Sequence, residues 1–173
     1  RAGIRQEVDM KMTLRWYGPE ADPIPLQYIR QIPGVTGIVT SLMDMPAGAL
    51  WPADRIAERK RQAEEAGLEM KVIESVNVHE DIKLGLPSRD EYIANYITTL
   101  ERLADAGVEV VCYNFMPIFD WTRTDLYMPL PDGSTCLSYN GKQIEGKSPE
   151  DMFKEIDNNS NGYAMPGWET ERM

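Results

Sequence analysis

Apolar and polar positions follow one repeated order along much of the chain, and this order predicts helices that are each followed by a buried strand. In three segments a helical pattern ends in a glycine, and a run rich in β-branched residues comes next. The segments are residues 30–42 (RQIPGVTGIVTSL), 64–76 (EEAGLEMKVIESV) and 104–115 (ADAGVEVVCYNF). A glycine just past a helix accepts the left-handed conformation that ends it, and a continuous apolar run is typical of a strand in a parallel sheet. A further run, MTLRWYG from Met12, predicts a strand with no helix before it.

The spacing of apolar residues also predicts the helices between these strands. After Ser88, which has the spacing of a capping box with Glu91, comes a stripe that should face the sheet: Tyr92, Ile93, Tyr96, Ile97, Leu100, Leu103 and Ala104. Other helices are expected at about residues 25–32 and 52–66. Residues 116–147 are expected to form a long loop, and Ser148 is expected to cap a last short helix that ends near Asp157.

Strands and helices that alternate in this way fit either a doubly wound sheet or part of a barrel. A doubly wound nucleotide-binding sheet calls for a glycine-rich loop after its first strand, whereas this chain has RWYGPEADP there, with a single glycine. A (β/α)8 TIM barrel needs eight strands and about 250 residues. The predicted fold class is therefore α/β, with residues 10–173 holding about the first four βα units of a TIM barrel. Residues 1–9 are expected to be a tag or an added remnant, because Met10 and Lys11 resemble a natural start.

Charge and composition exclude several classes of partner. The chain has 18 basic and 28 acidic residues, a formal net charge of −10, and no basic stretch, so we expect no nucleic-acid partner. No apolar run approaches the roughly 20 residues that span a bilayer, so we expect no membrane partner. Two cysteines without a secretion signal favour a reducing, cytoplasmic location.

Polar and aromatic side chains gather where the predicted strands end, which is where the active site of a barrel lies. The candidates for substrate binding are Arg15, Trp16, Glu74, His79, Asn114, Asp120, Trp121 and Arg123. The two arginines matter in so acidic a chain, because arginine grips a carboxylate through two hydrogen bonds. The alternative for each is an ordinary ion pair with a nearby Asp or Glu.

Each of the other candidates also has a structural explanation that competes with a functional one. His79 is a possible general acid or base, although a surface histidine without a partner is commoner. Glu74 would be costly to bury unpaired, so it should have a partner or a ligand. Trp16 and Trp121 are candidates for an apolar wall against sugar carbons, or for filling the barrel mouth. With one histidine and no H-x-x-x-H or C-x-x-C motif, these residues indicate no metal site.

Several runs of the sequence are long and use rare residues. They read MKMTLRWYG, IRQIPGVTGIVTSL, AGLEMKVIESVNVHEDIKLGLPSRD, VVCYNFMPIFDWTRTDL, LPDGST and NGYAMPGWE. Through them the chain resembles the mannonate dehydratase family over nearly all of residues 10–173. The resemblance implies a TIM barrel of the xylose-isomerase-like kind. It also implies dehydration of D-mannonate to 2-keto-3-deoxy-D-gluconate, in glucuronate breakdown, with Fe²⁺ or Mn²⁺.

The resemblance also implies a limit, because members of that family are about twice as long as this chain. Their metal ligands lie in the second half, in motifs such as IHPDDPP, CTGS and RPDHG, and none of these motifs occurs here. The metal ligands are thus expected outside this chain, the eight strand-end residues are expected to shape the substrate pocket, and these residues alone are expected to be inactive. Two other functions stay open: a non-catalytic sugar-acid-binding or partner-dependent half-barrel module, and a related sugar isomerase or epimerase. Because half a barrel has open strand edges, a homo-oligomer is expected.

Overall fold

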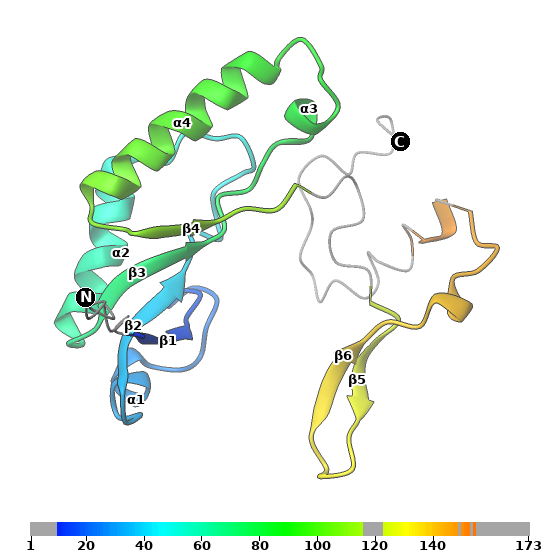
Figure 1. Cartoon of the computed structure of the whole chain (residues 1–173), viewed down its shortest axis with the longest axis horizontal. Coiled ribbons are helices and arrows are strands. Elements are labelled where there is room, and N and C mark those ends of the chain that lie inside the picture. The colour runs from blue at the N-terminus through cyan, green and yellow to red at the C-terminus, as the bar shows by residue number, and fades with distance from the viewer. Residues whose placement is uncertain (1–9, 116–122, 149, 153, 155–173) are drawn as a thin grey trace, which may run out of the picture. The chain divides into compact units, whose positions relative to one another are not determined.

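The chain divides into two compact units, Arg1–Phe115 and Met116–Met173, which are described here one at a time. The structure is a computed structural model, and it describes residues 10–115, 123–148, 150–152 and 154 (Figure 1). No helix among the residues it describes is long and apolar enough to cross a membrane.

The first unit is built on a four-stranded parallel sheet. Its strands are β1 (Met12–Arg15), β2 (Val35–Thr40), β3 (Glu69–Glu74) and β4 (Val110–Cys112), in the spatial order β1-β2-β3-β4 (Figure 1). Arg15 lies opposite Val39, and Glu74 lies opposite Cys112, so the carboxyl ends of the strands meet at one edge of the sheet. All four strands that the sequence predicted are present.

Helices α1 (Leu26–Arg30), α2 (Ala53–Glu65) and α4 (Arg89–Asp105) connect these strands, and a short helix α3 (Glu80–Lys83) precedes α4. Crossovers between parallel strands are right-handed, so strands that follow one another in sequence order place their helices on the same face of the sheet. A doubly wound sheet instead reverses its strand order at a switch point. The sequential order observed here fits a TIM-barrel-like fold.

The glycines that were expected to end the helices have the required backbone. Gly67 and Gly107 have φ of +73° and +86°, in the left-handed region. Around them the chain turns in the same way twice: Leu68 N–H donates to Ala63 O at 2.9 Å, and Val108 N–H donates to Leu103 O at 3.0 Å. The repeat that was seen in the sequence is therefore also a repeat in backbone hydrogen bonding.

The core of the first unit lies between the sheet and the first two connecting helices. It consists of Trp16, Leu26, Ile29, Val35, Ile38, Leu42, Trp51, Ile56, Ala63, Leu68, Met70, Ile73, Val76 and Leu103. Helix α4 buries only Thr99 and Leu103 fully. Ile93 and Ile97 are 38% and 50% exposed and Ala104 is exposed as well, so the prediction that the whole stripe is buried against the sheet is wrong for these three residues.

The predicted capping box at the start of α4 is also wrong. Ser88 is the N-cap residue, but its side chain makes no capping hydrogen bond. Its hydroxyl instead donates to the carboxylate of Asp81. The Asp81 carboxylate of α3 thus takes the hydrogen bond that the local sequence pattern had assigned to the start of α4.

The second unit contains a hairpin where a long loop was expected. Strands β5 (Asp125–Pro129) and β6 (Thr135–Ser138) pair antiparallel, with Met128 opposite Cys136, and a short 3-10 turn follows at Gly141–Gln143. The expectation of a loop is wrong for this part of residues 116–147. Ser148 does begin a helical turn as expected, since Asp151 N–H donates to its hydroxyl at 3.1 Å.

Candidate active site

An ion pair joins two of the candidate residues across the carboxyl edge of the sheet. Arg15, at the end of β1, donates to Glu74 Oε2, at the end of β3, over 2.5 Å. The guanidinium also lies over the ring of Tyr17, 4.5 Å from its centre. Arg15 Nε is buried and has no hydrogen-bond partner among the described residues. Glu74 thus has the partner that its position called for, and Arg15 takes the ion-pair alternative in this structure.

Trp16 has a place in the core rather than at an open surface. It is 4% exposed, and its indole N–H donates to Ile24 O at 3.1 Å. The guanidinium of Arg59, from α2, lies 5.1 Å from the centre of its ring and is paired with Glu20. Trp16 therefore anchors the connection between β1 and α1 to helix α2.

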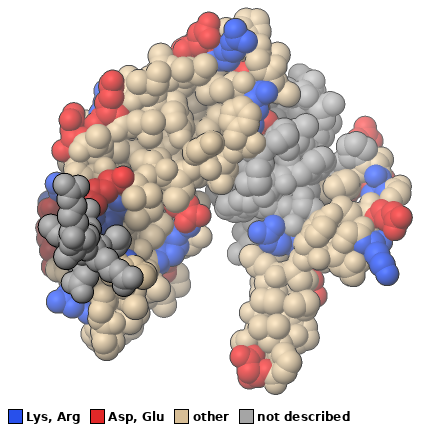
Figure 2. Space-filling view, viewed as in Figure 1, with Lys and Arg blue, Asp and Glu red and all other residues tan. Residues whose placement is uncertain are grey.

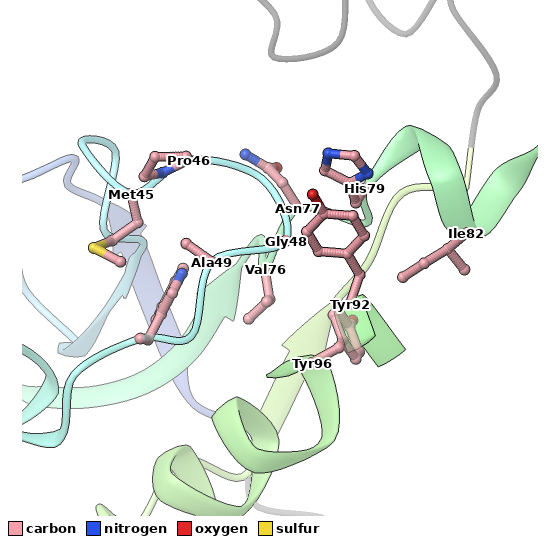
Figure 3. Close-up of a pocket in the computed structure, with 11 residues that line it drawn as sticks. Met45, Pro46, Gly48, Ala49, Val76, Asn77, His79, Ile82, Tyr92 and Tyr96 are labelled. Atoms are coloured by element: carbon pink, nitrogen blue, oxygen red, sulfur yellow. The ribbon is translucent and has the colours of Figure 1, made fainter. Parts of the chain in front are cut away.

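His79 is held in place by the segment that follows it and by helix α4. It is the N-cap residue of α3, and its Nδ1 accepts a hydrogen bond from Asp81 N–H at 3.1 Å. Its imidazole stacks on the ring of Tyr92, with 3.8 Å between the centroids and 19° between the planes. Figure 3 shows the two rings face to face beside the loop that carries Gly48.

The loop between β2 and α2 is fixed against this pair of rings by side chains from α4. Asn95 donates to Gly48 O at 3.0 Å, and Arg102 donates to Trp51 O at 2.5 Å. Together with the ends of β3 and α3, the loop encloses a small cavity of about 10 Å³ lined by Met45, Pro46, Gly48, Ala49, Trp51, Val76, Asn77, His79, Ile82, Tyr92 and Tyr96 (Figure 3). Burial raises the pKa of the Tyr96 phenol, and the neighbouring Tyr113 adds to the rise.

Helix α3 contributes charged side chains that are buried, which is unusual for Asp, Glu and Lys. Lys83 donates to Glu80 Oε1 at 2.6 Å, and both side chains are almost fully enclosed. Asp81 is equally buried and accepts from Ser88. The sequence did not indicate a role for Lys83 or Tyr92 beside His79, because their contacts depend on how α3 and α4 pack.

The remaining candidates follow β4 in the sequence. Asn114 is half-buried two residues beyond Cys112, the register partner of Glu74. Asp120 and Trp121 lie outside the described residues. Arg123 is half-buried and belongs to the second unit. The structure thus brings Arg15 and Glu74 into contact and places His79 after the end of β3.

The described residues do not supply a metal centre. Among residues 10–115 and the described part of the second unit, no three His, Cys, Asp or Glu side chains converge on a point that could hold an ion. The carboxylates of Glu80 and Asp81 are engaged by Lys83 and Ser88.

Comparison with known proteins assigns the chain to a family. The sequence profile described as D-mannonate dehydratase (UxuA) matches residues 10–173. The chain belongs to the D-mannonate dehydratase family. The match covers both units and includes every candidate residue at the strand ends.

Individual relatives agree with this assignment and differ from the chain in length. Mannonate dehydratases from Geobacillus thermodenitrificans and Endomicrobium trichonymphae are 57% and 58% identical over 164 residues, which is 95% of this chain but 44% and 45% of those proteins. The crystal structure of mannonate dehydratase from Streptococcus suis serotype 2 has a TM-score of 0.77 and 52% identity, and the match covers 90% of this chain and 45% of that one. The chain therefore spans less than half the length of these relatives.

Proposed function

We propose that the chain is the amino-terminal half of a TIM-barrel mannonate dehydratase, a lyase that converts D-mannonate to 2-keto-3-deoxy-D-gluconate. The observation that carries this proposal is identity of 52–58% to mannonate dehydratases over nearly the whole chain. The sequential parallel sheet supports the barrel, because four strands in this order are half of the eight that close one.

The reaction removes water from two neighbouring carbons of the sugar acid. The proton leaves the carbon next to the carboxylate, and the hydroxyl leaves the following carbon as water with the help of an acid. The enol that remains takes up a proton on the carbon that lost its hydroxyl and gives up the enol hydroxyl proton, which leaves the keto group of the product. Negative charge builds up beside the carboxylate during the first step, so groups that hold the carboxylate and hydroxyls in position favour the reaction.

In this proposal the first half of the barrel orients the substrate. Arg15 binds the carboxylate or a neighbouring hydroxyl, and Glu74 and Tyr17 hold the guanidinium in position through the contacts that they already make. Asn114, Asp120, Trp121 and Arg123, which follow β4 in the sequence, are proposed to bind the polyol, while Trp16 supports the β1 end from the core.

The divalent ion implied by the family, Fe²⁺ or Mn²⁺, does not fit the described residues of this chain, because no converging set of donors exists among them. We propose that its ligands lie in the part of the relatives that this chain does not match. When bound, such an ion would supply positive charge beside the developing enediolate. No step assigned here to residues of this chain depends on it.

An apolar surface favours the alternative in which this half-barrel depends on a partner. A groove of about 360 Å³ lies beside β4 and is lined by Val78, Ile82, Ile93, Tyr96, Ile97, Leu100, Val111, Tyr113 and Phe115. The surface over the middle of α4 and along β4 is mostly uncharged in Figure 2, and charged side chains gather toward its borders. A following βα unit, in the same or another polypeptide, would cover an apolar surface of this kind.

An activity assay tests the proposal. The 173 residues and a chain of full family length are each incubated with D-mannonate and Mn²⁺ or Fe²⁺, and formation of the 2-keto-3-deoxy acid is followed. We expect turnover only in the full-length chain, or when the 173 residues are combined with the missing half as a separate polypeptide. Turnover by the 173 residues alone at the full-length rate would contradict the half-barrel assignment, and no turnover by the full-length chain would contradict the activity.

A further inference from the structure

His79 has one ring nitrogen whose proton state the structure fixes. A backbone N–H can only donate, so the Nδ1 atom that accepts from Asp81 N–H at 3.1 Å carries no proton. The carboxylate of Asp81 does not compete for this nitrogen, because its Oδ1 lies 3.6 Å away, beyond hydrogen-bonding distance. A neutral imidazole with a bare Nδ1 carries its proton on Nε2.

The ring that carries this proton is confined on one face and at one edge. One face stacks on Tyr92 at 3.8 Å. Beside it, a Cβ at Gly48 would lie 3.0 Å from His79 Cδ2 and 2.5 Å from Tyr92 Cδ1, so no other residue fits at Gly48 without moving the rings. Gly48 also has φ of +78°, a conformation that residues with a side chain rarely adopt. The hydrogen bond from Asn95 to Gly48 O keeps the loop at this distance.

The imidazole is largely enclosed, but Nε2 is among its accessible atoms. The side chain of His79 is 12% exposed. No described residue accepts a hydrogen bond from Nε2, yet Nε2 is not among the buried polar atoms without a partner, so the remaining exposure includes this atom. His79 follows β3, whose carboxyl end carries Glu74, and the active site of a barrel lies at that end.

From these three observations we propose that His79 is a fixed hydrogen-bond donor, neutral and protonated on Nε2, which binds an oxygen of the substrate, and that Tyr92 and Gly48 are its positioning residues. Naming a sugar acid as the substrate rests on the proposed function, whereas the proton position does not. In this state Nε2 cannot act as a base, because it already holds the proton. It is also a poor acid, because losing that proton would leave an imidazole anion. His79 thus contributes binding and orientation rather than proton transfer.

Two substitutions separate this role from simple capping of α3. Asparagine is a good N-cap residue, so His79→Asn keeps an acceptor for Asp81 N–H but has no group at the position of Nε2. His79→Gln does the reverse. Its longer side chain places an amide N–H near the position of Nε2 but does not restore the cap. In the full-length dehydratase we expect His79→Asn to lower kcat/KM for mannonate by roughly tenfold or more with nearly unchanged stability. His79→Gln should recover most of kcat/KM while lowering Tm.

The reverse order would overturn the donor role. If His79 only caps α3, His79→Asn retains full kcat/KM and His79→Gln loses it together with stability. The positioning role is tested in the same assay: Tyr92→Leu should raise KM, and Tyr92→Phe, which keeps the stacked ring, should restore it. Equal KM values for Tyr92→Leu and the unchanged enzyme would remove Tyr92 from the proposal.

Nitrogen NMR of ¹⁵N-histidine-labelled full-length protein tests the proton position without substrate. The signal of His79 is assigned by its loss in His79→Gln, and its two ring nitrogens distinguish the Nε2–H tautomer, the Nδ1–H tautomer and the imidazolium. We expect the Nε2–H tautomer near neutral pH, and either other state would overturn the inference. If mannonate is not turned over but the Nε2–H tautomer is found, the proposed function fails and the fixed donor survives. If mannonate is turned over normally and the tautomer differs, only the donor inference fails.

Discussion

The middle of the β1–β4 sheet and its β4 end bury their apolar residues to very different extents. Residues 35–76, which hold β2, α2 and β3, contribute most of the core, including Ile38, Ile56 and Ile73. At the β4 end, helix α4, β4 and the residues just after it leave Ile97, Val110, Tyr113 and Phe115 about half or more exposed. Both regions have the sequence pattern of buried βα units, so the pattern alone does not say whether a neighbour is present.

This difference shows where the fold depends on contacts beyond residues 10–115. A parallel strand is typically covered on both faces and paired on both sides. β3 has two paired neighbours, whereas β4 is hydrogen-bonded only to β3 among the described strands. The side chains of α4 and β4 are therefore as apolar as those of a core but are exposed to solvent. Exposed apolar surfaces of this kind are typical of docking faces.

A pair of identical substitutions, one in the middle of the sheet and one at its β4 end, should give the largest contrast in stability. Ile73→Ala, on β3, removes a side chain that is 2% exposed and should lower the free energy of unfolding by about 2–5 kcal/mol. Ile97→Ala, on α4, removes one that is 50% exposed and should cost less than about 1 kcal/mol in the 173-residue chain. Urea unfolding followed by tryptophan fluorescence measures both, because Trp16 and Trp51 lie in the core. Equal losses at the two positions would mean that α4 is covered after all.

A charge in the groove should have opposite effects in the short and the full-length chain. Ile97→Lys should reduce self-association of the 173 residues, since exposed apolar patches drive association, and light scattering after size-exclusion chromatography measures this. In the full-length protein the same change should lower Tm, because the lysine would be buried against the next unit. Ala94→Lys is the matched control, because Ala94 is exposed on the same helix and does not line the groove. An unchanged Tm for Ile97→Lys in the full-length protein would show that no following unit covers the groove.

The parts of this structure that sequence could predict are those fixed by local pattern. The four strands, the long helices and the left-handed glycines follow from hydrophobic periodicity and from residues such as Gly67 and Gly107. A partner for Glu74 was also predicted, and Arg15 supplies it, although the Glu74 side chain is 46% exposed rather than buried.

The parts that sequence could not predict are set by packing between distant residues. The hydroxyl of Ser88 donates to Asp81, so the capping pattern in the sequence gave no capping hydrogen bond at α4. The stacking of His79 on Tyr92 depends on the path between α3 and α4, and nothing in the spacing of the two residues indicates it. The hairpin was missed because Pro129 and Pro131 interrupt the alternation that would have indicated its strands, although Asp132-Gly133 is a hairpin turn signal.

At the carboxyl edge of the sheet, substrate binding and stability should respond differently to one substitution. Arg15→Ala in the full-length enzyme should lower kcat/KM for mannonate by about tenfold, since hydrogen bonds to charged groups contribute about 1.5–3 kcal/mol. Its effect on stability should stay below about 1 kcal/mol, because both members of the Arg15–Glu74 pair are about one-third to one-half exposed. Arg61→Ala is the control, because Arg61 pairs with Glu58 and Glu65 on the surface of α2. Unchanged kinetics for Arg15→Ala would leave the Arg15–Glu74 contact as an ordinary surface pair, and Arg123→Ala would then be the remaining test of a carboxylate clamp.

The smallest predicted effect is a pKa change in the hairpin turn of the second unit, which, unlike the sheet of the first unit, is exposed. Two hydrogen bonds from Ser134, one from its hydroxyl at 2.7 Å and one from its backbone N–H at 3.0 Å, lower the pKa of the Asp132 carboxyl in the hairpin turn. A carboxyl whose pKa is lower in the folded turn stabilises that turn above the pKa of the unfolded chain, and the contribution is lost as the pH falls through the folded value. Ser134→Ala removes the hydroxyl but keeps the backbone N–H, so the pKa of Asp132 should rise part of the way toward its usual value. NMR titration of the Asp132 side chain in the two proteins measures the shift, and Tm should barely change because the turn is fully exposed. A pKa that is the same with and without the Ser134 hydroxyl would mean that the turn is not formed as described, since the hydroxyl then does not reach the carboxylate.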